Sequence, residues 1–262
     1  MDLDLRGKYA WVCGSTQGIG KASAQELARM GATITLIARN EQELIAVRDE
    51  LDKSFHQSHD FIIADFSKPD DLRLKIQMHL RDFNAPQLLV NNTGGPASGT
   101  ITEAKTEEFL SAFNNHLICN HILAQAVLPG MKAAKYGRIV NIISTSVKQP
   151  LKNLGVSNTI RAAVANWSKT LATEVASFGI TVNNVLPGAT NTARIANILE
   201  ARAQKTGKTI DELRNEMMME VPMQRLAEAS EIANAVAFVC SPAAGYITGI
   251  NLPVDGGRTG CL

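Results

Sequence analysis

The sequence predicts an α/β fold of the Rossmann-like, doubly wound type, in which a mainly parallel sheet carries helices on both faces. Short apolar runs typical of buried strands alternate with amphipathic helical stretches along almost the whole chain. The first run is followed by three glycines, Gly14, Gly18 and Gly20, and then by a helix. Because no linker, repeat or low-complexity stretch interrupts this pattern, residues 1–262 are expected to form a single domain.

The first half of the chain begins with the apolar residues Ala10, Trp11 and Val12, which predict a buried strand. Apolar residues then recur with helical spacing as far as Met30, and Gly31 follows as a suitable C-cap. The same alternation predicts further strands at 34–38, 61–64 and 87–90, and helices at 41–51 and 69–83, the last with Pro69 in its first turn.

The second half continues the alternation, with a long helix expected over 106–132 and a second one over 159–177. Residues 192–220 are expected to be helical but polar, and their run of three methionines suggests a mobile element, so we expect the segment 192–222 to cover the substrate. Strands are expected at 138–143, 181–186 and 250–254, and a last helix at 230–239.

Composition excludes several functional classes. A net charge of +1 gives no electrostatic basis for binding nucleic acid or an anionic membrane. No apolar run approaches the ~20 residues that span a bilayer, and the N-terminus resembles no secretion signal. Cys13, Cys119, Cys240 and Cys261 lack metal-ligand spacing and are expected to be free thiols. We therefore expect a cytoplasmic protein with neither a membrane nor a nucleic-acid partner and no metal.

The glycine triplet is placed where a dinucleotide site is built. One glycine allows a tight turn, one allows the backbone to approach phosphate, and one allows the helix to pack closely on the strand. The helix start then offers free N–H groups and a positive dipole end to a diphosphate. The spacing is G-x-x-x-G-x-G, not the more common G-x-G-x-x-G, and turn chemistry without a ligand is the alternative.

A second feature bears on the choice of cofactor. A carboxylate at the end of the second strand would accept hydrogen bonds from a ribose 2′-hydroxyl and select NAD(H). The sequence has Ala38-Arg39-Asn40 there instead. Because a guanidinium suits a 2′-phosphate, Arg39 favours NADP(H) over NAD(H), with a solvated loop arginine as the alternative.

Taken in order, these motifs resemble those of the short-chain dehydrogenases/reductases, over essentially the whole chain. Asn91-Asn92-Thr93-Gly94 is similar to the family's N-N-A-G, and Ser144 ends a strand similar to the one before its catalytic serine. Asp65-Phe66 resembles the aspartate that reaches adenine, and Thr192, after Pro187-Gly188, resembles the threonine that holds the nicotinamide amide. The expected cofactor-binding residues are Gly14, Ser15, Gln17, Gly18, Ile19, Gly20, Arg39, Asp65, Phe66, Asn91, Gly94, Arg161, Pro187, Gly188 and Thr192.

The resemblance implies a seven-stranded sheet, a nicotinamide cofactor and usually a homotetramer, with reductases of 3-oxoacyl and other carbonyl groups as the nearest relatives. Small residues on the helix after Arg161 would let another helix approach closely, so a homodimer or homotetramer is expected. Burial of this helix against its own sheet is the alternative explanation.

The sequence departs from the family at the catalytic motif Y-x-x-x-K, whose tyrosine follows the family's catalytic serine by thirteen residues. Counting from Ser144 gives Ser157, and four residues further gives Arg161. None of the three tyrosines has a lysine four positions later. His116 falls where the family has a helix asparagine, although a shift of one residue would place Asn115 there.

These substitutions leave two hypotheses open. An alkyl hydroxyl is a far weaker acid than a phenol, so Ser157 is a poor proton donor, whereas Arg161 stays charged and can hold ribose hydroxyls and stabilise an alkoxide. Ser144 would polarise the carbonyl oxygen of a small ketone or 3-oxoacyl substrate, with the corresponding alcohol as substrate of the reverse reaction. His116 is the substitute acid or a satisfied helix histidine. The chain is then either an NADP(H)-dependent oxidoreductase with an altered site, or an NADP(H)-binding sensor or assembly partner without turnover.

Four other charged or polar residues are expected to have structural roles. Lys148 and Lys152 lie between Ser144 and Ser157 and are expected to be surface lysines. His121 is expected in a packing interface. Arg194 is a possible anchor for a carboxylate or phosphate, but a solvated helix position is the expectation.

Overall fold

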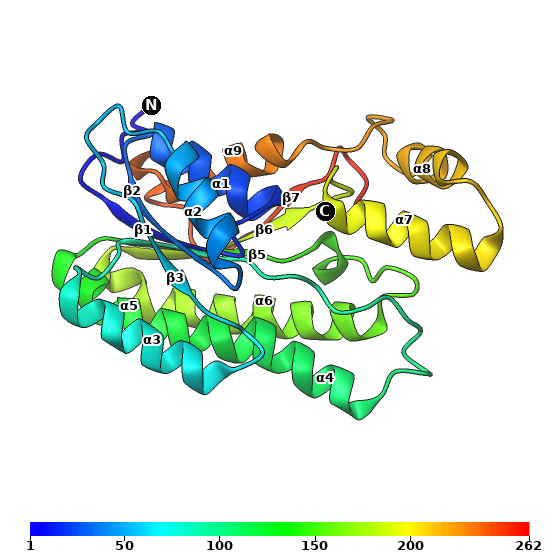
Figure 1. Ribbon diagram of the computed structural model, residues 1–262, viewed down its shortest axis with the longest axis horizontal. Helices are drawn as coiled ribbons and strands as arrows, with labels where there is room; N and C mark the ends of the chain where they lie inside the picture. The colour runs from blue at the N-terminus through cyan, green and yellow to red at the C-terminus, as the bar shows by residue number, and fades with distance from the viewer. Residues whose placement is uncertain (262) are drawn as a thin grey trace.

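The structure, a computed structural model, describes residues 1–261 and contains one seven-stranded sheet in the order β3-β2-β1-β4-β5-β6-β7 (Figure 1). Every neighbouring pair of strands is parallel. The order reverses between β1 and β4, and open α/β sheets bind ligands outside the carboxyl ends of the strands at such a switch point. The strands are β1 (Tyr9–Cys13), β2 (Thr33–Ala38), β3 (Asp60–Ile63), β4 (Leu88–Asn91), β5 (Gly137–Ile142), β6 (Ile180–Pro187) and β7 (Asn251–Val254).

Helices cover both faces of the sheet, as the sequence predicts. One face carries α1 (Gly18–Arg29), α2 (Glu41–Glu50) and α9 (Ala229–Cys240). The opposite face carries α3 (Pro69–Asp82), α5 (Cys119–Ala134) and α6 (Gly155–Val175) (Figure 1). The doubly wound fold is therefore confirmed.

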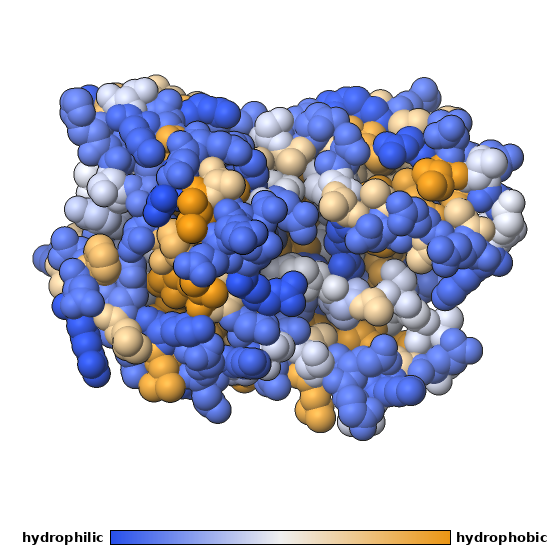
Figure 2. Space-filling model, in the orientation of Figure 1, coloured by the Kyte–Doolittle hydropathy of each residue, from blue (hydrophilic) through white to orange (hydrophobic). Residues whose placement is uncertain are grey.

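The core consists of two apolar layers, one on each side of the sheet. Within β1, Ala10 and Val12 belong to the layer under α1 and α9, whereas Trp11 and Cys13 belong to the layer under α3 and α5. This two-sided burial explains why the strand is a continuous apolar run and not an alternating one. The face in Figure 2 is largely hydrophilic, with hydrophobic residues in small separate patches. Within residues 1–261, no helix is long and apolar enough to cross a membrane.

The helix expected over 106–132 is interrupted. It consists of α4 (Thr106–Phe113), a π-helical turn (Asn114–Ile118) and α5. A π-turn contains one more residue than an α-turn and so rotates the side chains that follow it. His116 lies on this turn and is only 4% exposed. The interruption places an imidazole inside the protein at the carboxyl side of the sheet.

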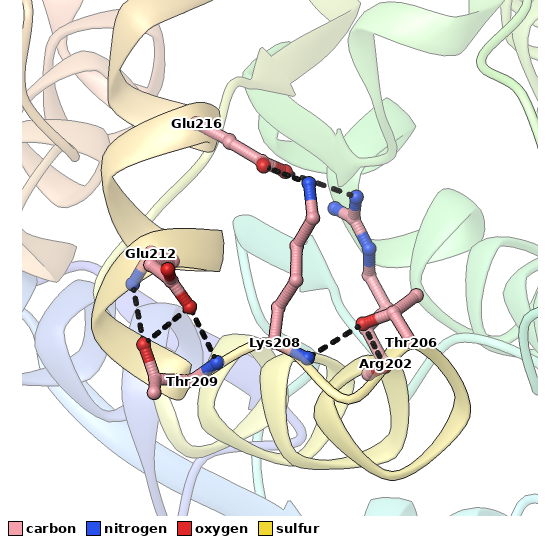
Figure 3. A network of polar contacts seen from close by, with 6 residues as sticks. All are labelled: Arg202, Thr206, Lys208, Thr209, Glu212 and Glu216. Carbon is pink, nitrogen blue, oxygen red and sulfur yellow. Dashed lines mark hydrogen bonds and ion pairs between the residues drawn. The ribbon is translucent and has the colours of Figure 1, made fainter.

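The segment expected to be helical over 192–220 is split into α7 (Ala193–Thr206) and α8 (Ile210–Met219). Gly207 ends α7 in the left-handed conformation, with φ +72°. Thr209 then caps α8, because its hydroxyl oxygen accepts the Glu212 N–H at 3.2 Å and the Glu212 carboxylate binds the Thr209 backbone N–H (Figure 3). The segment is therefore helical, as expected, and the break between its two helices has two signals in the sequence, the glycine and the T-x-x-E capping box.

A row of asparagine side chains crosses the sheet and was not anticipated. The amide nitrogen of Asn91 donates to Asn141 Oδ1 at 2.9 Å, and that of Asn141 donates to Asn184 Oδ1 at 3.0 Å and to the Ser168 hydroxyl at 3.2 Å. The Asn184 amide continues the row to Asn251 Oδ1 at 2.8 Å. These asparagines occupy paired positions on β4, β5, β6 and β7, so the ladder fixes the register of four strands.

Replacing Asn141 with leucine is expected to lower the free energy of unfolding by about 2–4 kcal/mol, because it leaves the buried amide of Asn91 and oxygen of Asn184 without partners. Urea denaturation measures this change. Asn234→Leu, on the exposed face of α9, is the matched control and should stay within about 0.5 kcal/mol of the wild type. Equal stability of the two variants would contradict a structural role for the ladder.

Candidate active site

The glycine turn between β1 and α1 has no room for side chains. A Cβ on Gly20 would lie 2.1 Å from the Gly14 carbonyl oxygen, and one on Gly14, where φ is +57°, would lie 2.8 Å from the Asn92 carbonyl oxygen. Gly18 starts α1 with φ +54°. Gln17 makes no side-chain cap, so the first-turn N–H groups of α1 stay available to a ligand. These observations fit a diphosphate-binding turn.

Asn92 belongs to the N-N-T-G motif but is not among the expected cofactor-binding residues, and the structure gives it a role at the glycine turn. Its amide nitrogen donates to the carbonyl oxygens of Cys13, at 3.3 Å, and Gly14, at 3.2 Å. It therefore ties the loop after β4 to the glycine turn across the switch point. The doubled asparagine after the strand is the only sequence signal for this role.

Two of the expected cofactor-binding residues support the turn from behind. The hydroxyl of Ser15 is fully buried and accepts the Ile37 N–H of β2 at 3.1 Å. Ile19 packs against the core layer under α1. The side chain of Gln17 is exposed beside the turn. Ser15 and Ile19 therefore position the backbone of the turn and offer no side-chain atom to a ligand.

The outer strands bring a cation and a carboxylate to the same edge. Arg39 follows β2 and is exposed, and Asp65 follows β3, which pairs with β2. The backbone N–H of Ser67 donates to Asp65 at 2.9 Å, and this bond, with the nearby charge of Arg39, holds the Asp65 pKa below its usual value. Phe66 is buried beneath. This edge offers an ionised acceptor and a free guanidinium.

The loops after β4 and β6 complete the rim. The side chain of Asn91 is 1% exposed and points into the asparagine ladder, so only its backbone is available to a ligand, whereas Gly94 is exposed. Beyond Pro187, the Gly188 N–H donates to the Val254 carbonyl at 2.9 Å. A Cβ built on Gly18 would lie 3.3 Å from the Thr192 methyl group, so the loop after β6 lies against the glycine turn.

Arg161 and Ser157, both on α6, meet the end of β5. The Arg161 guanidinium donates through Nη1 to the Ile143 carbonyl oxygen at 2.6 Å, and more weakly to that of Ile142 at 3.4 Å. Its Nε donates to the Ser157 hydroxyl at 3.2 Å. Ser144 directly follows Ile143, and its hydroxyl oxygen accepts the Ser146 N–H at 3.1 Å. The structure thus brings Ser144, Ser157 and Arg161 together.

His116 lies near Arg161 but is neutral at physiological pH. Burial, and then the charges of Arg161 and Arg194, lower its pKa to about 3, while a backbone contact with Gly94 acts in the opposite direction. An imidazole in this state offers one N–H donor and one acceptor nitrogen, not an acidic proton. The expectation that His116 titrates near neutrality as a substitute acid is therefore not supported by its surroundings.

Arg194 is exposed on a helix, as expected, but its guanidinium also makes two hydrogen bonds that were not expected. From the first turn of α7 it reaches across to the loop after β4, where Nη1 donates to the Gly95 carbonyl at 2.9 Å and Nη2 to that of Pro96 at 3.2 Å. A Cβ on Gly95 would lie 2.6 Å from Nη2, so the guanidinium rests directly on that glycine. No sequence signal marks this contact, because the partners are 99 residues apart.

The remaining candidates lie at the margin of the site. Lys152 is exposed and Lys148 is half-buried, and His121 is exposed with its ring edge toward Trp167. A cavity of about 280 Å³ opens beside Ser144, between the loop after β5 and the end of α8. Its lining residues are Thr145, Gln149, Leu151, Glu220, Arg258 and Thr259. A larger hollow of about 390 Å³ lies far from these residues, between Gly31 and the loop at 54–57.

None of the three tyrosines supplies a phenol to this site. Tyr9 starts β1 at the opposite end of the sheet. The Tyr136 hydroxyl donates to the Cys240 carbonyl at 3.3 Å, and Tyr246 is fully exposed. The only hydroxyls next to Arg161 in the described chain are therefore those of serine and threonine side chains.

A doubly wound sheet with a side-chain-free glycine turn at its switch point defines a dinucleotide-binding α/β protein. The family model described as "Enoyl-(Acyl carrier protein) reductase" matches residues 14–259. The 3-oxoacyl-[acyl-carrier-protein] reductases FabG of Pseudomonas aeruginosa and Haemophilus influenzae are 32% and 36% identical, over 97% of this chain and 98% of theirs. L-Sorbose reductase from Gluconobacter frateurii, solved with NADPH and L-sorbose, superposes with a TM-score of 0.93 at 32% identity over 100% of both chains. The chain belongs to the short-chain dehydrogenase/reductase family and is an oxidoreductase of that type.

Proposed function

We propose that this protein is an NADP(H)-dependent oxidoreductase that reduces a ketone or 3-oxoacyl group, or runs the reverse reaction, with Ser144, Ser157 and Arg161 in the catalytic positions. The observation that carries the proposal is the convergence of Arg161 and Ser157 on the end of β5, directly before Ser144. FabG is named for reduction of 3-oxoacyl groups, and the sorbose reductase was solved with NADPH. Similarity to these two proteins supports a carbonyl substrate and NADP(H) as the cofactor.

The residues present fit the cofactor. The glycine turn and the start of α1 would hold the diphosphate, Asp65 the adenine, and Thr192 the nicotinamide amide. Arg39 would pair with the 2′-phosphate, since it is exposed at the end of β2 and no carboxylate takes its place. When bound, the nicotinamide ring supplies or accepts the hydride.

The side chains then have separate tasks. The Ser144 hydroxyl accepts the Ser146 N–H, so its own proton is free to bond to the substrate carbonyl oxygen. Arg161 would hold the ribose hydroxyls and stabilise the negative charge that develops on that oxygen. Ser157 accepts from Arg161 Nε, which leaves its O–H free to relay a proton from water. His116 would contribute an N–H donor.

One observation favours a second candidate, an NADP(H)-binding protein without turnover. The pKa of His116 is lowered to about 3 and that of Arg161 is about 10, so neither group readily exchanges a proton near neutral pH. Loss of a general acid typically costs about 10²–10⁴ in rate. If water cannot replace the missing acid, the protein would bind NADP(H) without turnover and act as a sensor or assembly partner.

We further propose that the segment 192–222 covers the substrate and that the chain forms a homodimer or homotetramer in the cytoplasm. The cavity beside Ser144 is lined by Glu220 of this segment.

On α5 and α6, His121 is exposed against the partly buried Trp167, a surface that suits helix packing between subunits. Three of the four free cysteines are buried, as suits a reducing compartment. Light scattering of the purified protein reports the assembly, and a monomer would contradict it.

Fluorescence titration with NADPH and NADH tests the cofactor assignment. NADPH is expected to bind more tightly than NADH, and Gly20→Ala is expected to abolish binding because the added methyl group would overlap the Gly14 carbonyl. Gly99→Ala, where a Cβ meets no atom within 4 Å, is the control and should bind normally. Oxidation of NADPH with any member of a carbonyl panel supports the oxidoreductase, whereas binding without turnover at any pH supports the second candidate. No binding of either nucleotide would overturn both.

A further inference from the structure

Two arginines at the site have no carboxylate partner. Arg161 comes from α6 and Arg194 from α7, and each is close enough to His116 to lower its pKa. Within residues 1–261 neither forms an ion pair with an aspartate or glutamate. Their hydrogen-bond acceptors are backbone carbonyls and one hydroxyl. The site is therefore electropositive and lacks a counter-charge.

Arg161 has hydrogen-bonding capacity to spare. A guanidinium has five N–H groups, and here Nε and Nη1 are engaged while Nη2 has no partner within the described chain. The residue is only 7% exposed, yet Nη2 is not among the fully buried unpartnered atoms, so it is the part of the guanidinium that a ligand can reach. Burial and the neighbouring charge of Arg194 lower the Arg161 pKa to about 10, which still leaves it cationic at neutral pH. A bound anion would offset both the desolvation and the repulsion.

Arg194 is held by partners that an anion could replace. Its two bonds go to the neutral carbonyls of Gly95 and Pro96. Hydrogen bonds from a guanidinium to an anion are about twice as strong as those between neutral groups, and a carboxylate can accept two in parallel. Because Arg194 is exposed and lies at the start of α7, it can turn toward a ligand more easily than Arg161, which is fixed to the end of β5.

We propose that Arg194, with the uncompensated charge of Arg161 in the same cluster, binds the carboxylate of an anionic carbonyl substrate, an oxo acid or the corresponding hydroxy acid. The inference rests on the proposed function, because Ser144 next to Ile143 would receive the carbonyl oxygen of the same molecule. A carboxylate at Arg194 would supply the negative charge that both guanidinium groups lack within the described chain. The glycine turn already provides for the other anion expected nearby, the cofactor diphosphate.

Oxamate is a suitable probe, since it combines a carboxylate with an amide carbonyl that cannot readily accept a hydride. Calorimetric titration into the complex with NADPH should show binding that weakens as salt increases, and methyl oxamate, which lacks the charge, should not bind measurably. Arg194→Gln should weaken oxamate binding about 10- to 100-fold and leave the NADPH dissociation constant unchanged. Arg202→Gln is the matched control, because Arg202 lies on the same helix, is exposed and faces Glu216 of α8 at 3.9 Å (Figure 3).

The outcomes separate this inference from the proposed function. Equal binding of oxamate by the wild type and Arg194→Gln, or of oxamate and its methyl ester by the wild type, would overturn it. Weaker NADPH binding by Arg194→Gln with unchanged oxamate binding would also overturn it, since the anion at Arg194 would then be the diphosphate. A failure of NADPH to bind would overturn the proposed function. Oxamate titration of the protein alone would still test the arginine pair.

Discussion

Replacing Arg161 with methionine is expected to lower kcat/KM for carbonyl reduction by about 10²–10³-fold, the usual effect of losing one preorganised donor to a developing oxyanion. Methionine replaces the aliphatic part of the arginine side chain but has neither charge nor donors. The change also removes the bonds to Ser157 and to the Ile143 carbonyl, so the serine loses the group that orients its hydroxyl. The measurement is steady-state kinetics on whichever carbonyl compound the panel identifies.

Arg161→Lys is the matched variant, because it retains the cation but not the two-pronged geometry that reaches both Ser157 and β5. It should recover part of the lost rate, and the NADPH dissociation constant should increase more for methionine than for lysine. Urea denaturation of both variants separates unfolding from loss of chemistry. If Arg161→Met retained kcat/KM within threefold of the wild type, Arg161 would not be catalytic.

Replacing His116 with glutamine is expected to remove much of the acid sensitivity of folding. The His116 pKa is about 3 in the folded protein and near 6.5 in an unfolded chain. Between these values the unfolded chain binds more protons, so wild-type stability is complete above about pH 6.5 and falls as the pH decreases towards 3. The whole window corresponds to at most about 5 kcal/mol, of which about 2–3 kcal/mol is lost between pH 7 and pH 4.5.

The charges that face His116 are those of Arg161 and Arg194, and both act in the same direction as burial. Urea denaturation at pH 7 and pH 4.5 measures the effect as a difference between wild type and His116→Gln. His59 and His79, whose pKa values are also lowered by burial, contribute equally to both proteins and cancel. The exposed His56 serves as the control, since His56→Asn should keep the wild-type response. Identical pH dependence in wild type and His116→Gln would show that the ring is solvated.

Much of the local structure can be predicted because it depends on neighbours in the chain. Trp11 and the apolar residues beside it predict β1, and Pro69 marks the start of α3. The glycine turn is also local, since the clash of a Gly20 side chain with Gly14 involves residues of one turn. The break at Gly207 could have been predicted in the same way. The π-turn around His116 had no comparable signal.

The sequence by itself determined the doubly wound fold and the glycine turn, and it predicts that Ser157 and Arg161 occupy the family's tyrosine and lysine positions. Periodicity, glycine spacing and counting along the chain are enough for these, because each depends on residues close in sequence or on a fixed order of motifs. Only the tertiary structure decided that Asn91 belongs to a ladder, that His116 is neutral, and that Arg194 rests on Gly95. Hydrogen bonds and desolvation at these positions depend on partners from distant strands and helices, which meet only when the sheet is assembled.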